Sequence, residues 1–110
     1  MASVYKILAQ KAPAATTEET LYTVPNGYSA VVSTIAISNQ TSSAGTYRIA
    51  VRPAADETTA QKHYIVYGAT VPLNDSIMLT LGLTLAAGDK ILIFASSANQ
   101  SYSVFGSEIN

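Results

Sequence analysis

The chain has 110 residues, of which 48% are hydrophobic and only 12% are charged, and it contains no cysteine. Disulfides, thiolate catalysis and cysteine-based metal sites are therefore excluded. Six Lys and Arg stand against seven Asp and Glu, so the net charge of -1 leaves no basic surface for phosphates, and nucleic acid is not an expected partner. No apolar run approaches the roughly 20 residues of a membrane span, so no membrane contact is expected.

The length predicts one domain, residues 1–110, because domains usually comprise about 100–200 residues. A surface with so few charges is weakly hydrated, and we expect part of it to meet another chain. Ala12-Pro13-Ala14 resembles a signal-peptide cleavage site, but Lys6, Gln10 and Lys11 interrupt the apolar run before it. The sequence therefore predicts a protein made in the cytoplasm without an export signal.

From the N-terminus onward, the sequence predicts extended segments separated by turn residues. The first is followed by a polar connector containing Pro13, and the second ends at Pro25-Asn26-Gly27, a combination typical of a reverse turn. No segment shows a sustained helical period. The predicted strands are Val4–Leu8, Thr20–Val24, Tyr28–Ser38, Thr46–Arg52, His63–Val71, Ile77–Leu85, Lys90–Ala95 and Tyr102–Gly106.

The fourth predicted strand, Thr46–Arg52, alternates cleanly and stops at Pro53, which cannot donate to a ladder. We expect Tyr47, Ile49 and Val51 to face inward and Thr46, Arg48, Ala50 and Arg52 to face outward.

The fifth predicted strand places Tyr64 and Val66 on one face and Ile65 and Tyr67 on the other. Both faces are apolar, which predicts burial on two sides.

The sixth strand is the clearest, because hydrophobic residues occupy every second position, a period of two. These are Ile77, Leu79, Leu81, Leu83 and Leu85, which we call the leucine ladder. Short strands with regular turn signals indicate an all-β fold, an antiparallel two-sheet β-sandwich of about eight strands and of Ig-like or jelly-roll kind.

Residues that could carry chemistry are few. The single histidine, His63, has no partner at the spacing of a triad or zinc site, so we expect a structural or surface role. A small hydrolase that uses His63 is the least favoured hypothesis.

We interpret the acidic pairs Glu18-Glu19 and Asp56-Glu57 as solvated surface. Asp75 and Asp89 are expected to cap turns rather than bind calcium. The N-x-[ST] matches at Asn39, Asn74 and Asn99 are likewise interpreted as turns rather than glycosylation sites. The sequence predicts no catalytic residue, metal site or cofactor.

The seven tyrosines admit three interpretations: core residues with a solvent-reaching hydroxyl, interface residues, or a sugar-binding platform. We favour them in that order. From the facing arguments, the candidate interface residues are Arg48, Arg52, Ile65, Tyr67 and Phe105.

Four short motifs add a resemblance. They are Thr23-Val24-Pro25 before a turn, Ile49-Ala50-Val51-Arg52-Pro53, Leu85-Ala86-Ala87-Gly88-Asp89 and Phe105-Gly106-Ser107-Glu108. With the stretches around them, which cover nearly the whole chain, they resemble small structural proteins of tailed bacteriophages, notably those of cyanobacteria and other aquatic bacteria.

The resemblance implies a non-enzymatic virion component present in many copies. Such a protein would be a homo-oligomer that decorates or cements a capsid or tail, with a major capsid or tail protein as partner, assembled in the cytoplasm of a bacterial host. The alternative is a carbohydrate-binding adhesion module of a tail fibre or baseplate, with host glycans as ligands. Either way, we expect the first strand and the tail Phe105–Ile109 to pair with the domain or with a neighbour.

Overall fold

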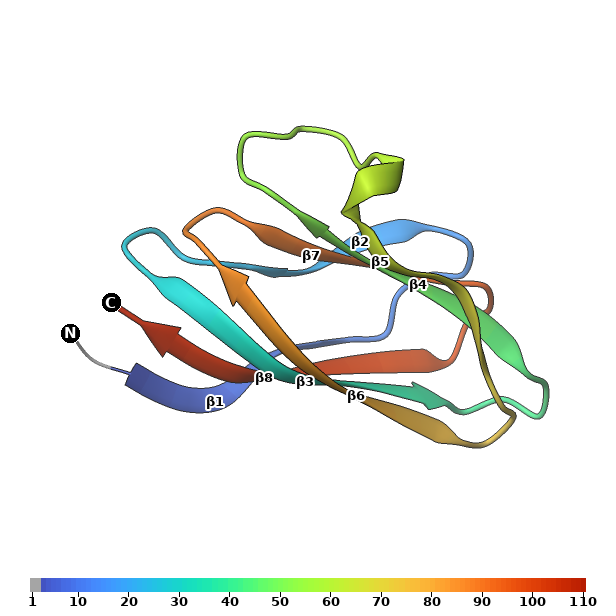
Figure 1. Cartoon of the computed structure of the whole chain (residues 1–110). Coiled ribbons are helices and arrows are strands. Elements are labelled where there is room, and N and C mark those ends of the chain that lie inside the picture. Colours follow the sequence, from blue (N-terminus) through green and yellow to red (C-terminus); the bar gives the residue numbers. More distant parts are fainter. Residues whose placement is uncertain (1–2) are drawn as a thin grey trace.

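The computed structural model describes residues 3–110, which form eight β-strands and one short 3-10 turn (Figure 1). The elements are β1 Ser3–Lys11, β2 Glu18–Thr23, β3 Ser29–Asn39, β4 Gly45–Arg52, η1 Gln61–His63, β5 Tyr64–Val71, β6 Ser76–Leu85, β7 Lys90–Ala95 and β8 Gln100–Ile109. All eight predicted strands are present, and the fifth begins one residue later than expected because His63 closes the 3-10 turn.

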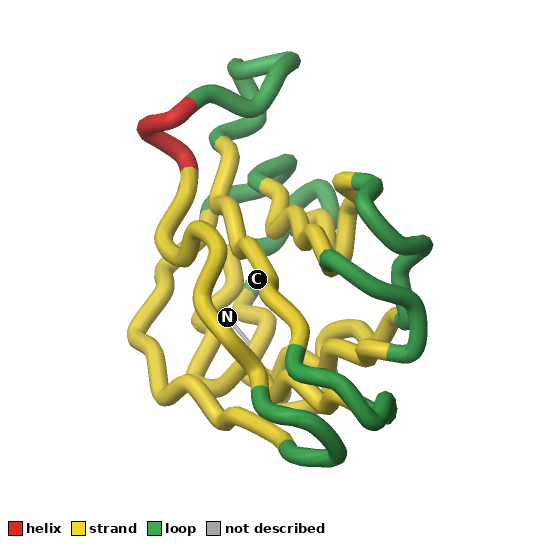
Figure 2. Tube along the Cα trace, turned by 90° about the vertical axis from the view of Figure 1, so that its right-hand side faces the viewer, coloured by secondary structure: helices red, strands yellow, loops and turns green. Residues whose placement is uncertain are grey.

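The strands form two antiparallel sheets packed face to face (Figure 2). Sheet A has the order β1-β8-β3-β6, and sheet B has the order β2-β7-β4-β5. β1 pairs with β8, β2 with β7, β3 with β6 and β4 with β5, so the chain is one long hairpin rolled into two layers. This connectivity is that of a jelly roll. The predicted sandwich is confirmed, and the jelly-roll alternative describes it.

The core lies between the sheets and is built from the inward positions of the alternating strands. Ile35, Ile37, Ile49, Ile91 and Tyr102 are fully buried there. Burying one such side chain stabilises the fold by about 1.5–3 kcal/mol. The leucine ladder faces the same core, as predicted, but Ile77 to Leu83 stay half-buried because β6 is an edge strand.

One prediction about facing and burial requires correction. β5 is an edge strand of sheet B, and Ile65 and Tyr67 are 44% and 64% exposed. The prediction that β5 is buried on both sides is therefore wrong. Ala50 points away from the core, as predicted, yet it is buried.

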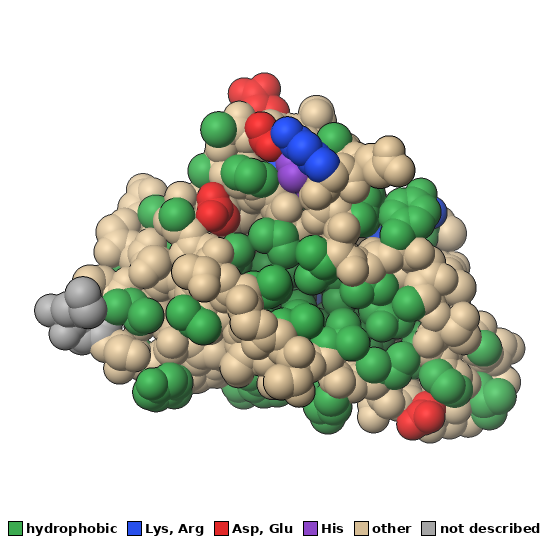
Figure 3. All heavy atoms as spheres, in the orientation of Figure 1, with side chains coloured by type: hydrophobic (Ala, Val, Ile, Leu, Met, Phe, Trp, Pro, Cys, Tyr) green, Lys and Arg blue, Asp and Glu red, His purple; other side chains and the backbone are tan. Residues whose placement is uncertain are grey.

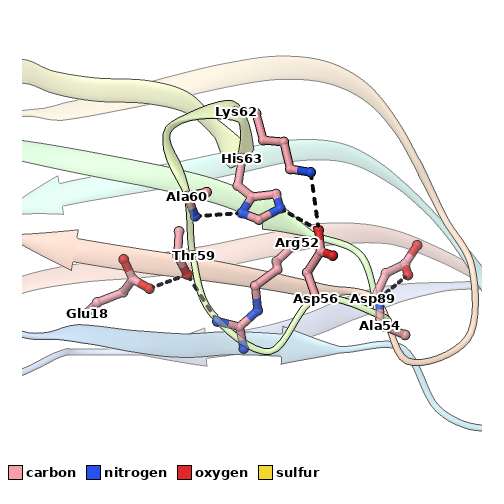
Figure 4. Close-up of polar contacts among 9 residues, drawn as sticks. All are labelled: Glu18, Arg52, Ala54, Asp56, Thr59, Ala60, Lys62, His63 and Asp89. Carbon is pink, nitrogen blue, oxygen red and sulfur yellow. Dashed lines mark hydrogen bonds and ion pairs between the residues drawn. The ribbon is translucent and has the colours of Figure 1, made fainter.

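Turn chemistry follows the sequence closely. Gly27 and Gly88 have φ of 82° and 84°, the left-handed region that glycine adopts without steric cost. The Asp89 carboxylate accepts hydrogen bonds from the Ala86 and Ala54 amides at 2.8 and 3.0 Å. Asp89 therefore caps its own turn, as predicted, and also ties that turn to the loop after β4 (Figure 4).

Candidate assembly surface

The outer face of sheet A carries no charged side chain. Cross-strand partners lie on the same face of a sheet, so the register gives its composition directly. Its three central rows are Tyr5-Ser107-Val31-Thr84, Ile7-Phe105-Thr34-Thr80 and Gln10-Ser103-Ala36-Met78. Ser3, Ile109 and Ser29 extend the face at one end, and Ser101, Ser38 and Ser76 extend it at the other. We call this surface the uncharged face.

Large apolar side chains stand exposed on the uncharged face among small hydroxyl side chains. Tyr5, Met78 and Ile7 are 84%, 66% and 53% exposed. Outward faces of antiparallel sheets usually carry charges, which keep the protein soluble and deter association. The uncharged face lacks this protection over four adjacent strands.

All three charged residues of sheet A are directed toward sheet B instead. Lys6 pairs with Glu108 at 2.7 Å, and Tyr22 of β2 donates to the same carboxylate at 2.5 Å. Lys11 pairs with Glu19 of β2 at 3.0 Å. The scarce charges of this sheet thus join the two layers along the β1–β2 side.

Electrostatics at Glu108 follow from that geometry. The carboxylate is buried, and the Lys6 ammonium and the Tyr22 hydroxyl hold its pKa below the ordinary value. Burial and the neighbouring Glu108 charge raise the pKa of Tyr22, which therefore remains a hydrogen-bond donor. The cluster is a structural clamp between β8, β1 and β2.

The free edge of sheet A adds to the uncharged face. β6 is ten residues long and contains neither a charged residue nor a proline, the devices that normally block pairing with another chain. Figure 3 shows hydrophobic side chains gathered on the open side of the sandwich, in the region between β6 and sheet B. An unblocked edge beside an uncharged face is a surface suited to contact another subunit.

The outer face of sheet B differs in kind. The Arg48 guanidinium stacks over the rings of Tyr67 and Phe94, 4.2 Å from each centroid. Glu18 accepts hydrogen bonds from the Tyr64 hydroxyl at 2.7 Å and from the Thr59 hydroxyl at 2.6 Å. Charged groups are therefore present here, and Arg48 and Glu18 are each engaged with neighbours on the same face.

The predicted interface residues are divided between these two faces. Arg48 and Tyr67 lie together on the outer face of sheet B, and Ile65 is exposed on the same edge strand. Arg52 binds the Thr59 hydroxyl at 3.1 Å, while Phe105 lies in the central row of the uncharged face. The five residues do not form one patch, and their role as contacts stays a prediction.

Sequence reasoning missed the exposed residues Tyr5, Ile7 and Met78. A signal was available, because Tyr5 and Ile7 share one face of a predicted strand and Met78 alternates with the leucine ladder. Of the tyrosines, Tyr22, Tyr47 and Tyr102 lie in the core, whereas Tyr5 and Tyr67 stand exposed.

The loop between β4 and β5 is organised around His63 (Figure 4). Nδ1 of His63 accepts a hydrogen bond from the Ala60 amide at 2.8 Å, which leaves Nε2 to donate to Asp56 at 2.8 Å. The bond from His63 holds the pKa of Asp56 below its usual value, and the Lys62 ammonium, 3.9 Å away, lowers it further.

This arrangement agrees with the structural role predicted for His63, since both ring nitrogens are engaged in hydrogen bonds within the loop. The interpretation of the acidic pairs as solvated surface is wrong for Glu18, Glu19 and Asp56. All three are half-buried and accept hydrogen bonds, Glu19 from the Ala14 amide at 2.7 Å. Among residues 3–110, no three acidic or histidine side chains converge as a metal site would require.

Replacing His63 with Phe is expected to loosen this loop. The Ala60 amide loses its acceptor, at a cost of about 1 kcal/mol in the free energy of unfolding. Urea unfolding measures this loss, and amide exchange should quicken in residues 54–63 while the core strands keep their protection. Unchanged exchange in the loop would show that His63 does not organise it.

Comparisons with known proteins find a likeness of fold. No protein-family model matches the chain, and no curated protein matches it. A chain in the structure of infectious bursal disease virus, Gx strain, superposes with a TM-score of 0.57 at 11% sequence identity. The match covers 97% of this chain but only 32% of the viral one, so the present chain spans about a third of that protein's length. At this identity the likeness establishes a shared fold.

Within the part of the chain that the structure describes, no helix has the length and hydropathy needed to cross a membrane.

Proposed function

We propose that this protein is a non-enzymatic structural component of a virus particle that associates with further copies of itself through the uncharged face. The observation that carries the proposal is the absence of charge on this face, together with the unblocked edge of β6. Since every charged residue of sheet A points toward sheet B, the outward surface is left to hydroxyl and apolar groups, which pack against a like surface without desolvating ions.

The size of the face is consistent with this role. Four strands spaced about 4.8 Å apart and about 30 Å long span roughly 600 Å² before side-chain relief is counted. A standard interface buries about 800 Å² on each partner. Two copies meeting over this face would thus bury an area that sustains a specific complex.

The finer assignment is to a tailed bacteriophage, in which the protein would decorate or cement the capsid or attach to the tail. The sequence motifs that resemble phage structural proteins support it, whereas the jelly roll shared with a chain of a virus supports only the broader assignment to a virus particle. The implied partners are further copies and a major capsid or tail protein. The engagement of both nitrogens of His63 supports a role without catalysis.

Light scattering after size exclusion tests self-association. The unmodified protein is expected above its monomer mass of 11.5 kDa at high concentration. Thr80→Lys places a charge in the central row of the uncharged face and is expected to return the protein to the monomer. Thr58→Lys, the same change on an exposed loop of the other sheet, is the matched control and should still associate. A monomer at every concentration contradicts the proposal.

Immunogold labelling tests the assignment to a particle. Antibodies to the purified protein are expected to decorate intact virions of the encoding phage at regular positions, and the labelled part identifies head or tail. Virions without label would exclude a surface role in the particle.

A further inference from the structure

A pocket opens on the outer side of sheet B, away from the uncharged face. It has a volume of about 570 Å³ and is lined by Thr59, Ala60, Gln61, Tyr64 and Tyr67. Small-molecule sites usually measure about 300–1,000 Å³. The pocket lies where η1 turns into β5, so one wall is an edge strand and the other is the organised loop that ends at His63.

One wall is an exposed aromatic ring held in a fixed position. Tyr67 is 64% exposed, yet the Arg48 guanidinium covers one side of its ring at 4.2 Å. Arg48 is itself stacked on Phe94, and Tyr64 meets Tyr67 edge to face with ring centroids 4.9 Å apart. A ring clamped in this way presents its free surface to solvent with little conformational entropy left to lose on binding.

The polar groups of the pocket are neutral, and hydrogen bonds orient two of them. The Tyr64 and Thr59 hydroxyls both donate to Glu18, which leaves their oxygen lone pairs as acceptors, and Thr59 already accepts one bond from Arg52. The Gln61 side chain is exposed and makes no hydrogen bond with another described residue, so its amide offers both donors and an acceptor.

Charge narrows the class of ligand. No lining residue is ionised, while Arg48 behind Tyr67 disfavours a cation and Glu18 behind Tyr64 and Thr59 disfavours an anion. What remains is a neutral molecule with one flat apolar surface and several hydroxyl groups at its rim. A pyranose ring has both, because its axial C–H groups form an apolar face and its equatorial hydroxyls donate and accept hydrogen bonds.

We propose that this pocket binds a neutral saccharide, with the sugar ring stacked on Tyr67 and its hydroxyl groups bonded to Gln61. The biological ligand would be a glycan displayed on a surface that the particle meets. It lies on the sheet opposite the uncharged face and does not depend on self-association.

NMR titration of the labelled protein with methyl glycosides of glucose, galactose, mannose and N-acetylglucosamine tests the site. At least one is expected to shift the amides of residues 59–67 with a Kd on the order of 1 mM. Tyr67→Ala should weaken that binding about tenfold or more, and Gln61→Ala should weaken it as well. Because both residues are exposed, neither change is expected to unfold the protein.

Tyr28→Ala is the matched control, because Tyr28 is an exposed tyrosine outside both the pocket and the uncharged face, and the affinity of this variant should equal that of the unmodified protein. No shift in residues 59–67 with any of the four glycosides, at concentrations well above the expected Kd, overturns the proposal. Equal affinity in the Tyr67→Ala variant overturns it too. Since association is read from the mass and binding from these amides, either proposal can fail without the other.

Discussion

Gly106→Ala is expected to lower the free energy of unfolding by about 3 kcal/mol, a large change for a single methyl group. Gly106 lies on β8 between Lys6 of β1 and Val32 of β3. A Cβ atom at this position would overlap the carbonyl oxygen of Val31. Because the obstacle is backbone, β3 and β8 would have to separate at their bulge, and ladder hydrogen bonds beside the core would be lost.

Gly82→Ala provides the matched control in the same sheet. An added Cβ there meets nothing within 4 Å, and Gly82 does not have a positive φ. Alanine is favoured over glycine in a strand by about 0.5 kcal/mol, so this variant should be as stable as the unmodified protein or slightly more stable. Urea unfolding of both variants at one fixed concentration measures the contrast. Equal effects at the two positions would contradict the role assigned to Gly106.

The strands were predictable because their signals are local. The leucine ladder, the alternation from Tyr47 to Val51 and the turn at Pro25-Asn26-Gly27 each depend on a few neighbouring residues. Strand order is set by contacts between distant segments, such as β1 with β8, and no local pattern reports them. The sequence therefore left Ig-like and jelly-roll connectivity equally open.

The uncharged face was harder to predict for a related reason. Its rows depend on register, and register shifts at Ile7 to Ala9 and at Val32 to Thr34 change which residues point outward. A shift of one residue reverses the facing of everything beyond it. Phe105 was identified as a contact candidate, but its cross-strand neighbours Ile7 and Thr34 lie on other strands.

The polar pocket shows the same limit at the level of single residues. Glu18 and Tyr64 are 46 positions apart, and Glu18 and Thr59 are 41 apart, so no spacing rule connects them. The sequence showed Glu18-Glu19 as two adjacent acids. In the fold, Glu18 contacts the loop that borders the pocket, and Glu19 pairs with Lys11. Two adjacent glutamates therefore stabilise different parts of the structure.

Use of charge connects the stability of this fold with its proposed assembly. Few ionisable groups are available, and those of sheet A are placed where they join the two sheets. This placement leaves the outer surface of sheet A without charge, so that it can contact another copy. It also means that the stability of the fold depends on the clamp at Glu108.

Glu108→Gln is expected to reduce the free energy of unfolding by about 2 kcal/mol at neutral pH, because the ion pair with Lys6 is lost and the bond from Tyr22 is weakened in a buried setting.

The effect of this substitution should also depend on pH. The folded-state pKa of Glu108 lies below its ordinary value of 4.5, so its contribution is fully present above that value and is lost as the pH falls through the folded-state pKa. The difference between the two proteins should therefore be largest near neutrality and should shrink as the pH falls below 4.5. Glu57→Gln, a change at an exposed loop glutamate, is the control and should match the unmodified protein throughout. Urea unfolding across this range measures the difference, and a gap that stays constant with pH would show that packing rather than ionisation accounts for the effect of Glu108.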